Sequence, residues 1–254
     1  MKTKALAACS GLLYLVCSAA FTLAQSVDDK PAEAPKPIPL TYQSLVSAHI
    51  LSAKPQFRQL YNGEAAGSMV LATEYEGENL VITDFTSVDR FHIAESMRCL
   101  LDAKTFALKS VDGTGRFGED PMKIELAWEG DHVKGHSTFP RSEKDKGDKL
   151  VDQTLPPGTF ERTALFALFH ALPLKEGETY TVNQYSTFDL RVQERTITVE
   201  GREQVTVPAG TFDAVKVILK GVPLTQVFYI ATDPVRKTVK IEVSGTPWSV
   251  ELLP

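Results

Sequence analysis

The sequence predicts an all-β protein, in which an antiparallel meander forms a curved sheet or barrel-like structure with one buried short helix. Three observations support this prediction. Apolar residues alternate with polar ones along many short segments, and a period of two places them on one face of a sheet. Gly, Asn and Asp separate these segments at short intervals, which is typical of a meander. One segment, residues 159–172, instead repeats apolar residues at helical spacing.

The clearest alternation lies between Thr196 and Lys220. We expect two or three strands here, joined by turns at Gly201-Arg202 and at Pro208-Ala209-Gly210-Thr211, because Pro presets its backbone angle and Gly reaches the left-handed region. Further strands are predicted at residues 57–61, 67–76, 80–88, 91–101, 105–111, 122–129, 132–139, 179–188, 190–200, 223–231, 236–244 and 248–252.

Four other segments do not follow the strand pattern. Residues 41–53 have helical spacing and predict a short helix. The Gly-rich run 112–118 predicts a hairpin loop, and the charged run 141–157 predicts a solvated loop. Residues 159–172 (TFERTALFALFHAL) predict a helix with Thr159 as its N-cap. Because this helix is apolar on nearly every face, we expect it to be buried as a plug within the sheet.

The start of the 254-residue chain has the form of a secretory signal peptide at residues 1–24. Lys2 and Lys4 precede an uncharged apolar stretch that ends in small residues at Ala24. The alternatives are an uncleaved membrane anchor and lipidation at Cys9, which would leave almost no apolar segment ahead of the cysteine. Residues 25–40 are rich in Pro and charge, which predicts a flexible linker, and residues 41–254 are predicted to be a single β-rich domain.

The composition excludes some partners. The chain has 27 basic and 32 acidic residues, a formal net charge of −5. Loss of Lys2 and Lys4 would leave 25 basic residues and a net charge near −7. This acidic balance gives no reason to expect a nucleic acid or an anionic membrane surface as a partner. After cleavage Cys99 would be the only cysteine, which we interpret as a small buried hydrophobe.

No motif in the sequence indicates a reaction, a metal or a cofactor. His132 and His136 are four residues apart, but four residues of strand rise about 13 Å, too far for one ion to bridge. The sequence has no Gly-x-Ser-x-Gly elbow and no phosphate-binding loop. Carboxylates are abundant, but without a cleft nothing indicates a shifted pKa. We therefore predict no catalytic residue, no metal ligand and no cofactor.

The remaining candidates are apolar and aromatic. A curved sheet can hold an apolar ligand on its concave face when its own side chains do not fill that space. We predict that the ligand-binding residues are Trp128, Phe160, Phe166, Phe169, Tyr229 and Trp248. The alternative is that these side chains form an ordinary core.

The segment Gly201–Val217 (GREQVTVPAGTFDAVKV) resembles the signature of domain-of-unknown-function family 3108, a family of exported bacterial proteins. The later residues Phe228-Tyr229 and Val239-Lys240-Ile241-Glu242 fit the same pattern, with Phe228 where the family often has Trp. The resemblance covers roughly residues 57–252. It implies a β-rich, barrel-like protein of a Gram-negative envelope, and it implies no catalytic residues.

Together these observations predict an exported periplasmic protein that is not an enzyme. We expect it to bind an apolar, lipid-like small molecule or an envelope protein partner. The first alternative is a structural or interaction protein whose interior is filled by its own side chains. The second alternative is a hydrolase whose site the sequence does not reveal.

Overall fold

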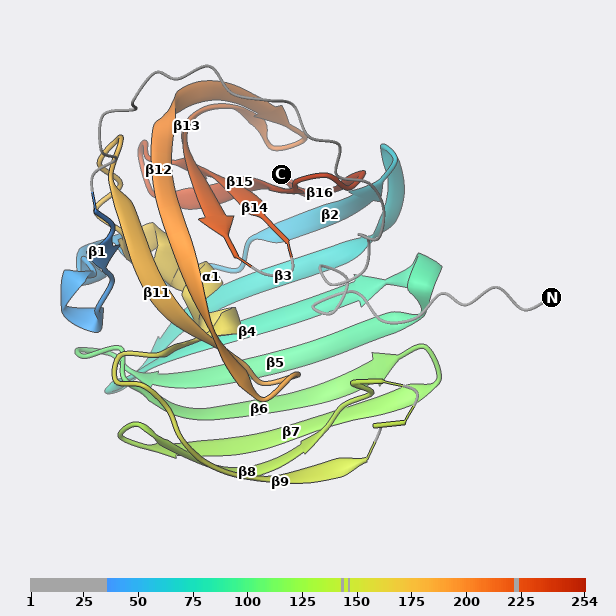
Figure 1. Cartoon of the computed structure of the whole chain (residues 1–254). Helices are drawn as coiled ribbons and strands as arrows, with labels where there is room; N and C mark the ends of the chain where they lie inside the picture. Colours follow the sequence, from blue (N-terminus) through green and yellow to red (C-terminus); the bar gives the residue numbers. More distant parts are fainter. Residues whose placement is uncertain (1–35, 143, 146, 222–223) are drawn as a thin grey trace, which may run out of the picture.

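The computed structural model describes residues 36–142, 144–145, 147–221 and 224–254. The described strands form one large curved sheet in the order β1-β11-β12-β13-β14-β15-β16-β2-β3-β4-β5-β6-β7-β8-β9, with β10 also paired to β11. The sheet does not close, since β9 and β1 end it on opposite sides. It curls around the helix α1 (Figure 1). The predicted fold class is confirmed: an all-β protein with one short buried helix.

Neighbouring strands are antiparallel, except that β1 and β10 lie parallel to β11. The strands are β1 (Ile38–Pro39), β2 (Gln56–Tyr61), β3 (Glu64–Glu76), β4 (Asn79–Val88), β5 (Ile93–Asp102), β6 (Leu108–Phe117), β7 (Asp120–Glu129) and β8 (His132–Thr138). They continue with β9 (Asp148–Thr154), β10 (Phe160–Glu161), β11 (Thr179–Ser186), β12 (Arg191–Val207), β13 (Gly210–Lys220), β14 (Gln226–Ala231), β15 (Lys237–Val243) and β16 (Trp248–Leu252). The helical elements are η1 (Tyr42–Ser44), η2 (Ser47–His49), η3 (Asp89–Phe91), α1 (Arg162–Leu168) and η4 (Phe169–Ala171).

Glycines permit the strong curvature of the sheet. A Cβ added at Gly67, Gly115 or Gly135 would fall within 2.2 Å of a carbonyl oxygen on the adjacent strand. No larger residue fits at such a distance unless the backbone moves, and glycine within a strand typically marks a bend or a close backbone approach.

The same effect explains why the prediction of a loop at residues 112–118 was wrong. Most of this run belongs to β6, whose residues from Asp112 to Phe117 pair with both β5 and β7. A Cβ at Gly113 would lie 2.5 Å from the Sδ atom of Met97. The glycines at 113 and 115 therefore provide space inside the curved sheet, and the chain turns only after Phe117.

Two other strand assignments differ from the sequence prediction. The predicted turn at Gly201-Arg202 is a register shift within the long strand β12, between Val199 and Arg202, so this strand continues where two strands were expected. The turn before Gly210 is confirmed, because Val207 and Gly210 are paired across it. Within the charged run 141–157, the sheet gains the edge strand β9, which pairs with β8 along seven residues. A pairing on one side is enough to order this polar segment.

The helix lies inside the curve of the sheet. Every residue of α1 is buried, as predicted. The helix is shorter than residues 159–172, because Phe160 and Glu161 form β10 and the last turn is the 3₁₀ helix η4. Its N-cap is Glu161 rather than Thr159, and the carboxylate accepts hydrogen bonds from the backbone N–H groups of Thr163 and Ala164.

The predicted N-terminal helix at residues 41–53 is replaced by two short 3₁₀ turns, η1 and η2. Val46 between them is extended and donates its backbone N–H to the carbonyl oxygen of Ala171. This contact with η4 interrupts the helical hydrogen bonding of the segment. The sheet begins at Ile38, within the segment predicted as a linker. The predicted signal peptide and Cys9 lie outside the described residues.

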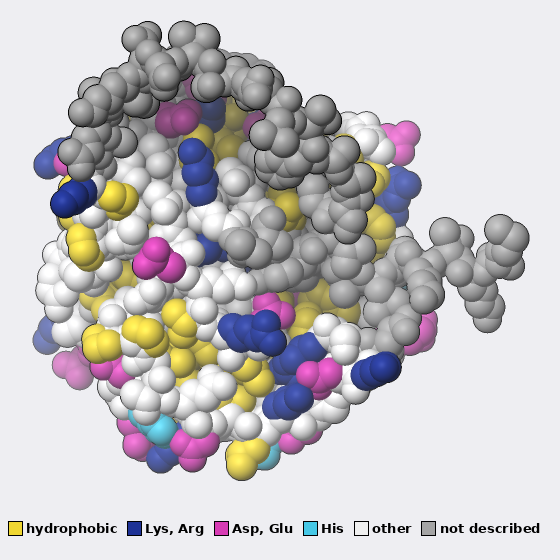
Figure 2. Space-filling model, in the orientation of Figure 1, with side chains coloured by type: hydrophobic (Ala, Val, Ile, Leu, Met, Phe, Trp, Pro, Cys, Tyr) yellow, Lys and Arg dark blue, Asp and Glu magenta, His cyan; other side chains and the backbone are white. Residues whose placement is uncertain are grey.

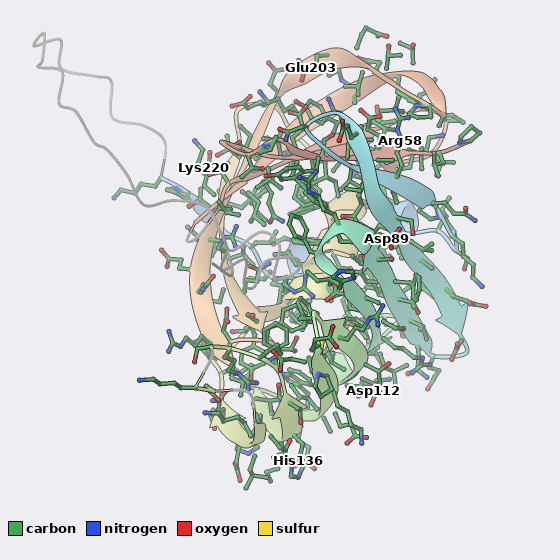
Figure 3. All side chains as sticks on the ribbon, turned by 90° about the vertical axis from the view of Figure 1, so that its right-hand side faces the viewer. Arg58, Asp89, Asp112, His136, Glu203 and Lys220 are labelled. Atoms are coloured by element: carbon green, nitrogen blue, oxygen red, sulfur yellow. The ribbon has the colours of Figure 1, made fainter. Side chains whose placement is uncertain are left out.

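Charged side chains cover the outer face of the sheet, where Asp112 and His136 point away from the enclosed space (Figure 3). On the face seen in Figure 2, hydrophobic side chains are visible between groups of charged ones. Within the described part of the chain, no helix is long and apolar enough to cross a membrane.

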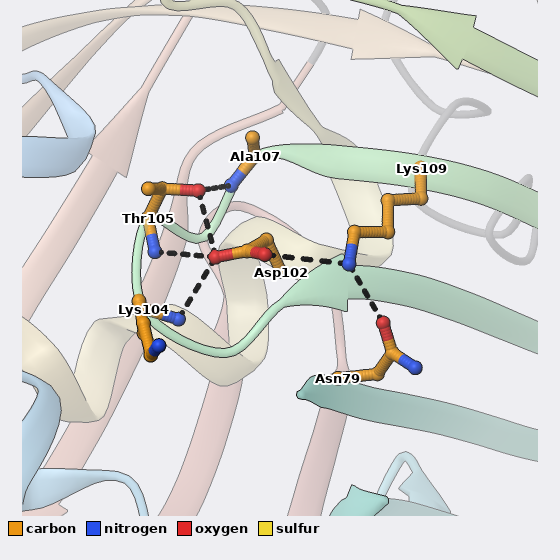
Figure 4. Close-up of polar contacts among 6 residues, drawn as sticks. All are labelled: Asn79, Asp102, Lys104, Thr105, Ala107 and Lys109. Carbon is orange, nitrogen blue, oxygen red and sulfur yellow. Dashed lines mark hydrogen bonds and ion pairs between the residues drawn. The ribbon is translucent and has the colours of Figure 1, made fainter. Parts of the chain in front are cut away.

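The turn between β5 and β6 is held by one carboxylate (Figure 4). Asp102 accepts hydrogen bonds through Oδ1 from the backbone N–H groups of Lys104 and Thr105, at 3.0 and 2.9 Å. Its Oδ2 lies 3.3 Å from Lys109 Nζ, which also donates to Asn79 Oδ1 at 2.7 Å. The hydrogen bonds from Thr105 and Lys104 hold the pKa of Asp102 well below its usual range.

Candidate ligand pocket

A pocket of about 450 Å³ opens where the C-terminal end of α1 meets the start of β15 and the end of β16. This volume lies within the usual range for small-molecule sites. The apolar part of the lining is formed by side chains from five parts of the chain, and the polar part contains three cationic residues. The apolar residues include Leu51, Leu71, Ala167, Val235, Leu252 and Leu253, and the polar ones are Lys54, Gln56, Thr73, His170, Arg236 and Lys237.

His170 is held in one neutral form in the pocket wall. Its Nε2 atom accepts a hydrogen bond from the backbone N–H of Thr238 at 3.0 Å. A ring nitrogen that accepts cannot also bear a hydrogen, so the imidazole hydrogen lies on Nδ1. Burial, followed by the nearby positive charge of Arg236, lowers the pKa of His170 to about 4. At neutral pH the pocket therefore contains an uncharged imidazole whose Nδ1–H is a donor.

Arg236 caps the C-terminal end of the helical segment formed by α1 and η4. Its Nη1 group donates to the carbonyl oxygens of His170 at 2.9 Å and Leu172 at 2.5 Å, which have no partner within the helix. In the described part of the chain, Nε and Nη2 make no hydrogen bond and the guanidinium has no carboxylate partner. Burial, with a further effect from Arg202, lowers the pKa of Arg236. The side chain is thus a partly desolvated cation with unused donors.

The other two cations of the pocket are also weakly compensated. Lys237 Nζ lies 4.6 Å from the centre of the Phe212 ring and forms no ion pair with a described carboxylate. Lys54 Nζ is 4.0 Å from Glu74, and both side chains are more than half exposed, where an ion pair contributes at most about 1 kcal/mol. No Asp or Glu side chain is among the described lining residues, and the acidic group that lines the pocket is the terminal carboxylate of Pro254. The three cationic side chains outnumber it, so the described lining has an excess of positive charge.

The six residues predicted to bind a ligand do not meet in one site. Phe166 and Phe169 lie together, with ring centres 5.2 and 4.5 Å from that of Phe228 on β14. All three rings are less than 10% exposed, so they fill the space between helix and sheet. Their helix neighbours Ala167 and His170 line the pocket instead.

The other four predicted residues are found in separate places. Phe160 packs on Tyr42, Trp128 on Tyr185, and Trp248 on Tyr61. Tyr229 follows Phe228 in β14 and therefore points to the opposite face of the sheet, where its hydroxyl donates to Glu242 at 2.9 Å. None of the six lines the pocket.

A family model described as a protein of unknown function (DUF3108) matches residues 56–246. The chain belongs to this family. The resemblance seen in Gly201–Val217 is thereby confirmed, and DUF3108 spans nearly the whole sheet from β2 to β15. No curated protein matches the chain. Among solved structures, the chain is similar to a beta-barrel-like protein of the DUF1849 family from Brucella abortus, with 11% identity and a TM-score of 0.48 over 80% of this chain and 97% of that one.

The DUF3108 domain also encloses a polar cluster at the N-terminal end of α1. Glu161 Oε2 accepts from the backbone N–H groups of Thr163 at 2.7 Å and Ala164 at 3.0 Å, and lies 3.4 Å from the Sγ atom of Cys99. The guanidinium of Arg162 lies 4.4 Å from the centre of the Phe188 ring. The cluster attaches the start of the helix to β5 and to the segment after β11.

Burial raises the pKa values of Asp84 and Glu161, while the positive charge of Arg162 opposes the rise. Burial and then Glu161 raise the pKa of the Cys99 thiol, so this cysteine is protonated and a poor nucleophile. Cys99 is buried, as the sequence predicts, whereas the acids around it were not predicted. Asp84 lies at a spacing of two from Ile82 in β4 and shares its buried face with Leu80 and Val88, and that position was the available signal in the sequence.

The two histidines considered as metal ligands bind separate carboxylates. His132 Nε2 lies 2.8 Å from Asp152 Oδ1, and His136 Nδ1 lies 2.8 Å from Asp148 Oδ2. Both contacts join β8 to the edge strand β9. Among the described residues, no group of three or more His, Cys, Asp or Glu side chains could hold a metal ion.

Proposed function

We propose that this protein is exported to the periplasm and binds an apolar, lipid-like ligand there without catalysing a reaction. The observation that supports the proposal is the pocket of about 450 Å³ with an apolar floor formed by residues such as Leu71, Ala167 and Leu252. An apolar cavity with a few polar groups at one side is the usual form of a small-molecule site. The bound chain would replace water against these side chains, at about 0.8 kcal/mol for each buried CH₂ group.

The predicted aromatic residues have a different role in this proposal. Phe166 and Phe169 support the helix against Phe228, and the ligand occupies the space beside Ala167. The alternative function, an interaction protein with a filled core, is favoured by the same dense aromatic packing and requires no ligand.

Binding of straight-chain alcohols to the delipidated mature protein would separate the two functions. Affinity should rise from octanol to dodecanol by a constant factor for each added CH₂ group, until the pocket is full. Val235 is an exposed lining residue, so Val235→Trp should fill the pocket and abolish binding. Leu150→Trp is the matched control, because Leu150 is an exposed apolar residue of β9 away from the pocket. Lack of binding, or equal loss in both variants, would favour the filled-core alternative.

A further inference from the structure

The arrangement of charge around the pocket points to the chemical class of the ligand. We propose that the occupant is a single-chain amphiphile with an anionic headgroup, a carboxylate or a phosphate, which Arg236, Lys237 and Lys54 hold at the mouth while the chain lies on the apolar floor. This inference rests on the proposed function and adds a headgroup to it.

Positive charge is in excess at the pocket, where three cationic side chains face one terminal carboxylate, that of Pro254. Arg236 directly precedes β15 and Lys237 is its first residue, and both line the pocket. In the described part of the chain, neither forms an ion pair with a carboxylate. On the same strand, by contrast, Lys240 Nζ lies 2.6 Å from a carboxylate oxygen of Glu242. Unpaired cations beside an apolar surface favour an anion that brings its own apolar chain.

Hydrogen-bond donors at the pocket also fit an anionic headgroup. Arg236 uses Nη1 to hold two helix carbonyls in place, which fixes the guanidinium plane and leaves Nε and Nη2 for another acceptor. A guanidinium edge of this kind matches the two oxygens of a carboxylate or phosphate. His170 adds an Nδ1–H donor, because its Nε2 accepts from Thr238. A headgroup that can only accept hydrogen bonds fits this set, whereas a cationic headgroup does not.

The size of the pocket suits a ligand with one alkyl chain. A pocket of about 450 Å³ is at the small end of the usual range for ligand sites. The floor is formed by aliphatic side chains and the methyl groups of Ala53 and Ala167, which suit a flexible alkyl chain. One chain with one headgroup therefore fits the space better than a lipid with several chains.

Calorimetric titration of the delipidated protein with four probes tests the inference. Dodecanoate and dodecyl phosphate should bind at least tenfold more tightly than dodecanol, and dodecyltrimethylammonium should bind more weakly than dodecanol. The better of the two anionic probes identifies the headgroup. Added salt should weaken binding of the anionic probes and leave dodecanol unchanged, since salt screens exposed charges.

Variants locate the effect. The double variant Lys54→Met and Lys237→Met should reduce affinity for dodecanoate about tenfold and leave affinity for dodecanol unchanged. Lys104→Met lowers the net charge in the same direction at an exposed turn far along the sequence and should change neither. Equal binding of dodecanoate and dodecanol would overturn the anionic headgroup, and so would an undiminished affinity of the double variant. Inorganic phosphate is titrated as a fifth probe, and its binding in a way that excludes dodecanol would assign the cations to a free anion and overturn the proposal. If no alkyl probe binds, the proposed function itself fails.

Discussion

Protonation of His170 should destabilise the folded protein at mildly acidic pH. The imidazole is neutral in the fold because Nε2 accepts from the Thr238 N–H, and its pKa is lowered from 6.5 to about 4 by burial and by Arg236. In the unfolded chain the pKa returns to about 6.5. Between these two values the unfolded state binds more protons than the folded state. Stability from this site is therefore fully present above pH 6.5 and is lost as the pH falls towards 4.

The magnitude follows from the two pKa values. A difference of this size corresponds to about 3 kcal/mol once both states are protonated, at 1.36 kcal/mol for each pKa unit. Between pH 7 and pH 5 the linkage relation gives a loss of about 2 kcal/mol. Asp84 and Glu161 act in the opposite direction, because burial raises their pKa values and protonation at low pH favours the fold. The contribution of His170 must therefore be measured as a difference.

His170→Gln provides that difference. Gln can accept from the Thr238 N–H but does not titrate. Urea unfolding, followed by the fluorescence of the two Trp residues, would be measured at pH 7 and pH 5 for both proteins. We expect the wild type to lose about 2 kcal/mol more than the variant between these pH values. Equal losses in the two proteins would refute the argument that His170 is held neutral by its surroundings.

Three further predictions concern the fold. Gly115→Ala should lower the free energy of unfolding by about 3 kcal/mol, because the Cβ would lie 2.2 Å from the Ala94 carbonyl oxygen. Gly147→Ala is the control in urea unfolding, because a Cβ there meets no atom within 4 Å. Equal effects of the two substitutions would contradict the steric explanation. Glu161→Ala should lower stability by about 1–2 kcal/mol through loss of the helix cap, whereas Glu161→Gln keeps an acceptor and should cost less, so the reverse order in thermal unfolding would be unexpected. Asp102→Asn should reduce the loss of stability between pH 7 and pH 3, since the pKa of Asp102 is lowered in the fold; an unchanged acid sensitivity in urea midpoints would show that its hydrogen bonds do not depend on charge.

Strands could be predicted where apolar residues alternate and turn residues follow, as at Trp248–Leu252, where predicted and observed bounds agree. The rule failed where the environment of a residue is set by distant parts of the chain. Gly113 and Gly115 were assigned to a loop, because in sequence glycine usually marks a turn. In the fold they face Met97 and the backbone of β5, and no local pattern contains that contact. The edge strand β9 was not predicted for a related reason, since among the described strands it pairs with β8 alone.

The helix was recognised because its apolar residues repeat on every face, and a helix of that kind must be buried. Its cap was placed at Thr159 on residue type alone. The cap is Glu161, because Phe160 and Glu161 first pair with β11 and so delay the start of the helix. A carboxylate at this buried position is stable only with the donors that the fold supplies, among them the two backbone N–H groups at the start of α1.

The residues predicted to bind a ligand are large aromatic side chains, and none of them lines the pocket. Large side chains fill space: Phe166, Phe169 and Phe228 interlock and leave no room for a ligand. Space remains where the side chains are small, and the pocket is lined in part by Ala53 and Ala167. Its polar groups come from positions 54, 170 and 236–237, which only the curved sheet brings together. A local signal of such a site was present in the sequence. Arg236 and Lys237 are adjacent cations between two apolar strands, and the nearest acid in sequence is Asp233.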